Sequence, residues 1–168
     1  MLSEGTEAPD FTLSGLGPPD EDGTREFTEY HFGTFAEGSS TLLAFYPGDF
    51  SPVCTAELCS LEEMELRATE GAYDVFGISR DSLFIHEAFA YEHDLAFPLL
   101  RDVTGDVCRS YDAVHEEPAG GGVTTGLAKR SLYVLDGERS VTYAWQSDDS
   151  HVEPDLEDAV EALRALGT

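Results

Sequence analysis

The sequence predicts an α/β fold in which helices flank a central mixed β-sheet. Short runs with strand character alternate with longer helical stretches along the chain. The run Thr41–Tyr46 is almost continuously apolar, as expected of a strand buried on both faces. Two further strand candidates are joined across Asp136-Gly137-Glu138 as a hairpin, and a helix candidate closes the chain. Such an order is typical of a sheet covered by helices on its faces.

Each expected element has its own signal, and we place the boundaries as follows. Ser51-Pro52 opens a helix that runs to about Glu70, and Asp81-Ser82 caps a second one. The expected strands are Phe11–Leu13, Glu26–Phe32 at an edge, Thr41–Tyr46, Tyr73–Ile78, Phe97–Leu100, Ser131–Leu135 and Ser140–Trp145. The helix that Asp81-Ser82 caps is expected at Leu83–His93. Two more helices are expected, at Gly105–Tyr111 and in a last segment with Leu156, Val160 and Leu163 on one face. Turn-rich or glycine-rich loops are expected at Gly15–Gly23 and Glu116–Gly126. This order fits a thioredoxin-like fold with an N-terminal extension, and we expect one domain over residues 1–168.

The charge balance narrows the classes of partner. The chain carries 34 acidic and 9 basic residues, a net charge of −25, and Lys129 is its one lysine. Such a charge repels nucleic acid and anionic membranes, so neither is expected as a partner. An acidic surface so poor in lysine resembles those of salt-in haloarchaea, and it predicts a protein that works in concentrated salt. An ordinary acidic protein is the alternative.

Compartment and redox state follow from two further observations. The chain shows neither a membrane-spanning apolar run nor the basic and apolar regions of a secretory signal, so we expect a cytoplasmic protein. Its three cysteines, Cys54, Cys59 and Cys108, are too few and too odd in number for a secreted disulfide framework. In a reducing cytosol a cysteine is usually either a buried apolar residue or a reactive one.

Cys54 is the candidate reactive residue. It lies in the first turn of the helix that follows the Thr41–Tyr46 strand, where free backbone N–H groups and the helix dipole favour thiolate over thiol. The thiolate is the nucleophilic form of cysteine. Ser51 is expected to present a hydroxyl near the sulfur. Pro47 is expected to shield the sulfur from water. A buried cysteine that happens to begin a helix is the alternative.

The surrounding motif resembles that of the peroxiredoxins. Pro47, Ser51 and Cys54 match Pro-x-x-x-Thr/Ser-x-x-Cys, and Phe45-Tyr46 before the motif and Thr55-x-Glu57 after it also agree. The segments Gly5-x-x-Ala8-Pro9-Asp10-Phe11 and Gly126–Asp136, which contains Arg130, are similar to the family as well. Serine at position 51, where threonine is commoner, lacks the methyl group that fixes the rotamer.

The resemblance implies a thiol peroxidase. Cys54 would reduce hydrogen peroxide or an organic hydroperoxide and become a sulfenic acid. Arg130 would hydrogen-bond the thiolate and the peroxide oxygens, because a guanidinium stays charged and presents its donors in a fixed fork. No cofactor is implied. The implied partners are the peroxide and a thioredoxin- or glutaredoxin-like dithiol reductant, for a monomer or a homodimer.

The spacing of Cys59 resembles that of the Q-type peroxiredoxins, also called bacterioferritin comigratory proteins, whose resolving cysteine lies five residues after the first. In an intact helix the two Cα atoms would be about 7.5 Å apart along the axis and about 140° apart around it. A disulfide needs a Cα separation of about 4.4–6.8 Å, so the helix would have to unwind locally. Resolution by an external thiol stays open, and Cys108 is expected in the core.

The remaining signals are weaker. His86 and His93 share a helix face without a third ligand at metal spacing, so we interpret them as solvated and expect no metal site. A disulfide oxidoreductase would need Cys-x-x-Cys, whereas this chain has Cys-x-x-x-x-Cys. A non-catalytic thioredoxin-fold redox sensor or binding module is the alternative from another class.

Overall fold

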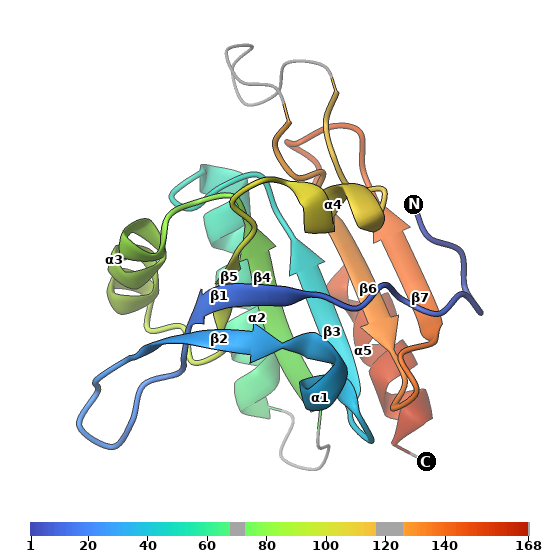
Figure 1. Ribbon diagram of the computed structural model, residues 1–168, viewed down its shortest axis with the longest axis horizontal. Coiled ribbons are helices and arrows are strands. Elements are labelled where there is room, and N and C mark those ends of the chain that lie inside the picture. The colour runs from blue at the N-terminus through green and yellow to red at the C-terminus, as the bar shows by residue number, and fades with distance from the viewer. Residues whose placement is uncertain (68–72, 117–125, 168) are drawn as a thin grey trace.

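A seven-stranded mixed β-sheet forms the centre of the computed structural model, which describes residues 1–67, 73–116 and 126–167 (Figure 1). The strand order across the sheet is β2-β1-β5-β4-β3-β6-β7. β4 pairs in parallel with both β3 and β5, and the other neighbours are antiparallel. The strands are β1 (Thr12–Leu16), β2 (Phe27–His31), β3 (Ser40–Phe45), β4 (Tyr73–Ser79), β5 (Leu99–Arg101), β6 (Ser131–Leu135) and β7 (Val141–Gln146).

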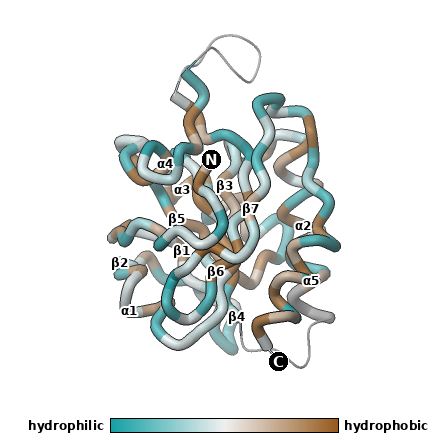
Figure 2. The backbone as a smooth tube through the Cα atoms, turned by 90° about the vertical axis from the view of Figure 1, so that its right-hand side faces the viewer, coloured by the Kyte–Doolittle hydropathy of each residue, from teal (hydrophilic) through white to brown (hydrophobic). Residues whose placement is uncertain are grey.

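Helices cover both faces of this sheet, as predicted. α2 (Pro52–Arg67) and α5 (Leu156–Leu166) lie on one face, and α1 (Phe32–Ala36) and α4 (Asp106–Ser110) lie on the other (Figures 1 and 2). α3 (Leu83–His93) lies beside β1 and β5. Ser82 caps α3, as expected, by accepting a hydrogen bond from the backbone N–H of Ile85 at 3.3 Å.

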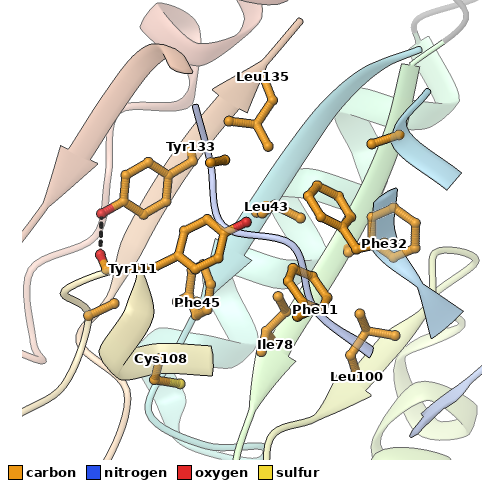
Figure 3. Packing of buried hydrophobic residues seen from close by; sticks show 14 of the residues in the cluster. Phe11, Phe32, Leu43, Phe45, Ile78, Leu100, Cys108, Tyr111, Tyr133 and Leu135 are labelled. Carbon is orange, nitrogen blue, oxygen red and sulfur yellow. Dashed lines mark hydrogen bonds between the residues drawn. The ribbon is translucent and has the colours of Figure 1, made fainter. Parts of the chain in front are cut away.

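β3 supplies both hydrophobic cores, because its side chains alternate between the two faces. Leu43 and Phe45 enter the first core, where the Phe45 ring packs on Tyr111 with centroids 5.0 Å apart (Figure 3). Leu42 and Ala44 enter the second core, under α2 and α5. The predicted strand at 41–46 is therefore confirmed as buried on both faces.

The second core surrounds the predicted reactive cysteine. Cys54 lies in it together with Leu58 and Leu61, all from α2. Leu163 of α5 packs into the same core beside the smaller Ala159. The apolar face predicted for the last helix is thus confirmed in part: Leu163 is buried, whereas Leu156 and Val160 are half-buried.

The N-terminal edge of the sheet departs from the prediction. β1 continues through Gly15 and Leu16, where a turn-rich loop was expected to begin. A Cβ at Gly15 would approach the Leu100 side chain to 2.4 Å, so glycine at this position permits close packing of β1 on β5. A glycine taken as a turn signal is therefore a packing requirement inside a strand.

Smaller differences lie at element ends. Phe97 and Pro98 precede β5, whose strand begins only at Leu99. The short helix α1 begins at Phe32, which was predicted to end a strand. The expected end of the helix near Glu70, and all but the ends of the expected loop at Glu116–Gly126, lie outside the described residues. Among the described residues, no helix is both long and apolar enough to cross a membrane.

Candidate active site

Cys54 lies at the start of α2, directly after the loop that follows β3. Ser51 begins the helix: its carbonyl accepts the backbone N–H of Thr55 at 2.8 Å, and its Oγ accepts the backbone N–H of Cys54 at 3.5 Å. Pro52 follows at the first helical position, where a missing N–H costs nothing. The Cys54 side chain is fully buried in the second core. Cys54 thus lies in the first turn of a helix, as the sequence predicted, and its sulfur is buried.

Arg130 reaches the sulfur from the neighbouring strand. Because Phe45 pairs with Ser131 in the antiparallel β3–β6 ladder, Arg130 lies beside the end of β3, where the active loop begins. Its Nη2 donates to the Cys54 Sγ at 3.2 Å and to the Ser150 carbonyl at 2.8 Å. Arg130 is fully buried, so it is not a surface arginine at a strand end.

Glu57 is the third member of the cluster. It lies one helical turn after Cys54, it is fully buried, and its Oε2 accepts a hydrogen bond from the Arg130 Nη1. Burial raises the pKa of Glu57 to about 7, helped by the charge of Glu153, although Arg130 lowers it. Glu57 lies within the matched motif, but no role was predicted for it from the sequence. An acid three residues after the cysteine on the same helix was the available signal.

The two acidic groups share one guanidinium. Burial disfavours the charge of Arg130, but the charges and hydrogen bonds of Glu57 and Cys54 outweigh it and raise the pKa of Arg130. The guanidinium therefore stays charged, and Glu57 is the partner that takes up a proton near neutral pH. One cation then faces the Cys54 sulfur and a carboxyl group, and all three groups are buried.

The loop before Cys54 holds the other predicted residues. Pro47 is half-buried and follows Tyr46 at the end of β3. Phe50 adopts a left-handed conformation with φ of 64°, which is rare for a residue with an aromatic side chain. Since the Ser51 Oγ accepts from a backbone N–H, its own O–H proton remains available for a second hydrogen bond.

Cys59 lies apart from this cluster. It is half-buried on α2, which is continuous from Pro52 to Arg67. Burial raises the pKa of Cys59, and the charges of Glu63 and Glu62 act in the same direction. With the helix intact, Cys59 is not brought to the Cys54 sulfur, as the helix geometry predicted.

Cys108 belongs to the opposite side of the sheet. It is fully buried in the first core (Figure 3), whereas Cys54 lies in the second core. Burial and the nearby Asp102 raise the pKa of Cys108 well above its ordinary value. The prediction that Cys108 is a core residue is confirmed.

The prediction that His86 is solvated is wrong. Its side chain is fully buried, with Nδ1 2.6 Å from the Asp49 Oδ2 and Nε2 3.1 Å from the Leu100 carbonyl. The pairing of α3 with the loop after β3 places this histidine inside, which the helical spacing with His93 could not reveal. His93 is half-buried and packs against the ring of Phe89.

One group within the described ranges has the spacing of metal ligands. Ligand atoms of Asp49, Asp81 and His86 lie within 4.8 Å of one another. Hydrogen bonds engage the facing atoms: the Asp49 backbone N–H and the Ser79 hydroxyl both donate to the Asp81 Oδ2, at 2.8 and 2.6 Å. We therefore interpret the group as a hydrogen-bonded network.

Comparisons with known proteins agree with this geometry. The AhpC/TSA family profile matches residues 5–144. The chain is 30% identical to a putative peroxiredoxin bcp of Coxiella burnetii over 153 residues, covering 90% of this chain and 94% of that protein. It is 31% identical to a chloroplastic peroxiredoxin Q of Triticum aestivum over 147 residues, covering 87% of this chain and 60% of that protein. The crystal structure of Enterococcus faecalis AhpC superposes with a TM-score of 0.82 at 25% identity, covering 98% of this chain and 92% of that one.

The fold is therefore the thioredoxin-like fold of peroxiredoxins, as predicted. Within it, a buried cysteine at a helix start accepts a hydrogen bond from an arginine that lies next to the adjacent strand. The chain belongs to the AhpC/TSA family and is a peroxiredoxin, an enzyme that reduces peroxides with a cysteine thiol.

The raised pKa of Glu57 predicts a pH-dependent cost to stability. Since the folded-state pKa of about 7 exceeds the ordinary value of 4.5, the folded chain holds this proton more tightly. The contribution of Glu57 to the free energy of unfolding is therefore fully present below pH 4.5. It falls by up to about 3 kcal/mol as the pH rises to about 7. Glu57→Gln should remove that loss.

Urea unfolding at pH 5, 6, 7 and 8 measures this effect. The free energy of unfolding of the parent should fall relative to Glu57→Gln as pH rises. Glu161→Gln, an exposed change on α5, is the control and should follow the parent. Parallel pH profiles for the parent and Glu57→Gln would show that Glu57 does not titrate in this range.

Proposed function

We propose that the Cys54 thiolate reduces hydrogen peroxide and organic hydroperoxides at this site. The sulfur attacks one peroxide oxygen, an S–O bond forms and the O–O bond breaks. Cys54 becomes a sulfenic acid, and the departing oxygen takes a proton and leaves as water or an alcohol. The observation that carries the proposal is the 3.2 Å hydrogen bond from the Arg130 Nη2 to the Cys54 Sγ.

Arg130 acts on both the nucleophile and the leaving group in this proposal. Its charge favours the thiolate in the resting enzyme, and its forked donors stabilise the negative charge that develops on the peroxide oxygens. The hydrogen bond to the Ser150 carbonyl and the ion pair with Glu57 support this role, because they fix the plane of the guanidinium. A donor that is already in place needs no reorganisation during the reaction.

The loop residues complete the proposed site. The Ser51 hydroxyl, which keeps a proton to donate, would hydrogen-bond the sulfur or the bound peroxide. Pro47 would shield the site from water and leave the following backbone N–H groups free to donate. These roles are supported by the position of both residues in the loop that ends at Cys54.

For the second half of the cycle we propose that Cys59 resolves the sulfenic acid as an intramolecular disulfide. The spacing of five residues resembles that of the Q-type peroxiredoxins, and the Cys59 side chain is half-buried, nearer the surface than the fully buried Cys54. Because α2 is continuous, its first turns must unwind to bring the two sulfur atoms together. Unwinding would also expose the disulfide to a dithiol reductant such as a thioredoxin- or glutaredoxin-like protein.

We place this activity in the cytoplasm, in a monomer or homodimer whose residues 1–168 act as one domain. Three free cysteines suit a reducing compartment, where thiol reductants recycle the enzyme.

The resolution step predicts a specific product. One equivalent of hydrogen peroxide should link Cys54 to Cys59 with loss of helix, measured by peptide mapping and circular dichroism. Cys54→Ser should abolish turnover with the fold intact, and Cys59→Ser should react once and stop at the sulfenic acid. A Cys54 sulfenic acid that persists in the parent while Cys59 stays reduced would instead assign resolution to an external thiol.

The acidic surface leads us to propose adaptation to concentrated salt. A net charge of −25 repels itself in dilute buffer, whereas at about 1 M salt the screening length is only ~3 Å. The melting temperature should therefore rise steadily from dilute buffer to molar KCl. NaCl is the control and should act alike at equal ionic strength, because screening depends on ionic strength. A melting temperature that is flat or falls would contradict this proposal and leave the peroxidase site untouched.

A further inference from the structure

A buried hydrogen-bonded chain runs from the loop before Cys54 into the sheet. The side chains of Asp49 and His86 are both fully buried. The Asp49 carboxylate accepts the Tyr46 hydroxyl at Oδ1, 2.6 Å away, and faces the His86 Nδ1 at Oδ2, also 2.6 Å away. The other ring nitrogen of His86 lies 3.1 Å from the Leu100 carbonyl of β5. These contacts tie the loop, α3 and β5 together.

The hydrogen-bond partners of His86 and Tyr46 indicate which atoms carry protons. A carbonyl can only accept, so the His86 Nε2 carries a proton. Burial and the nearby Asp49 raise the pKa of Tyr46 well above its ordinary value, so its hydroxyl stays protonated and donates to Asp49. The two ring nitrogens of His86 therefore lie between two acceptor groups, the Asp49 carboxylate and the Leu100 carbonyl.

The loop needs such an anchor. Asp49 lies two residues before Ser51, and its backbone N–H donates to the Asp81 Oδ2 at 2.8 Å. The next residue, Phe50, is held at φ of 64° and packs on Phe89 of α3. A strained residue persists only where its surroundings fix it, and here the fixing contacts come from Phe89 of α3 and from Asp81, which follows β4.

We propose that His86 is a positioning residue for the peroxidase reaction: through Asp49 it holds the loop 47–51 in the conformation that receives the peroxide. The proposal rests on the proposed function of that loop. Arg130 and the helix start act on the sulfur without passing through His86. Loss of the His86–Asp49 bond should therefore slow the reaction with peroxide much more than it changes the nucleophilicity of the thiolate.

Two substitutions separate the hydrogen bond of His86 to Asp49 from its hydrogen bond to Leu100. In His86→Asn the amide N–H takes the place of Nδ1, which keeps donation to Asp49 and loses the bond to Leu100. In His86→Gln the amide lies near the position of Nε2, which keeps the bond to Leu100 and loses Asp49. His93→Gln is the matched control, because His93 lies on the same helix but takes no part in these hydrogen bonds.

The experiment measures two rates at Cys54 in the full chain. One is oxidation by hydrogen peroxide, followed by rapid quenching and peptide mass analysis, and the other is alkylation by iodoacetamide. His86→Gln should lower the peroxide rate about 10- to 100-fold and change alkylation less than about twofold. His86→Asn should recover most of the peroxide rate, and His93→Gln should match the parent.

Three results would overturn the proposal: an unchanged peroxide rate in His86→Gln, an equal loss of both rates, or an equal loss in His86→Asn and His86→Gln. Should His86→Gln fail to fold, Asp49→Asn and Asp49→Ala provide the same contrast, because an asparagine amide can still hydrogen-bond the His86 ring and an alanine cannot. The proposal then requires a slow peroxide reaction in Asp49→Ala alone. A parent that does not react with peroxide would instead contradict the proposed function itself.

Discussion

The hydrogen bond from Arg130 to the Cys54 sulfur depends on a guanidinium that is fully buried, and the rest of the site is arranged around that charge. An unpaired buried cation would cost several kcal/mol. Glu57 and the Ser150 carbonyl supply the pairing, and together with the sulfur they engage the Nη atoms of the guanidinium. The sheet makes this possible, because the β3–β6 pairing brings the end of one strand beside the start of the other.

A single cation between two acidic groups has a chemical consequence. When Glu57 is protonated, the full charge of Arg130 acts on the sulfur. When Glu57 is ionised, it competes for the same charge. Because the pKa of Glu57 is raised to about 7, this competition is set near neutral pH. The site is thus tuned by the burial of an acid as well as by the arginine that bonds the sulfur.

The sequence predicted the parts that depend on local signals. The apolar run of β3, the Ser82 cap and the helix start at Cys54 each follow from neighbouring residues. Arg130 was found because a motif match joined two distant segments, and its contact with the sulfur agrees with that match, although its catalytic role stays a prediction.

The features that sequence analysis missed are set by tertiary contacts. Gly15 was interpreted as a turn residue. Its close approach to Leu100 depends on the pairing of two strands that are distant in the sequence, so no local pattern reveals it. Glu57 is paired with an arginine 73 residues away in the chain. His86 was expected in solvent, because its partner Asp49 lies in a loop whose path no local pattern fixes.

The most direct test of the account compares the parent with Arg130→Lys in the reaction of Cys54 with hydrogen peroxide. Lysine keeps the charge and loses the forked donors that join the sulfur, Glu57 and Ser150. We predict that the second-order rate constant falls by about 10²- to 10³-fold at neutral pH, as for the loss of an oriented donor. A rate constant within about twofold of the parent would contradict the central claim.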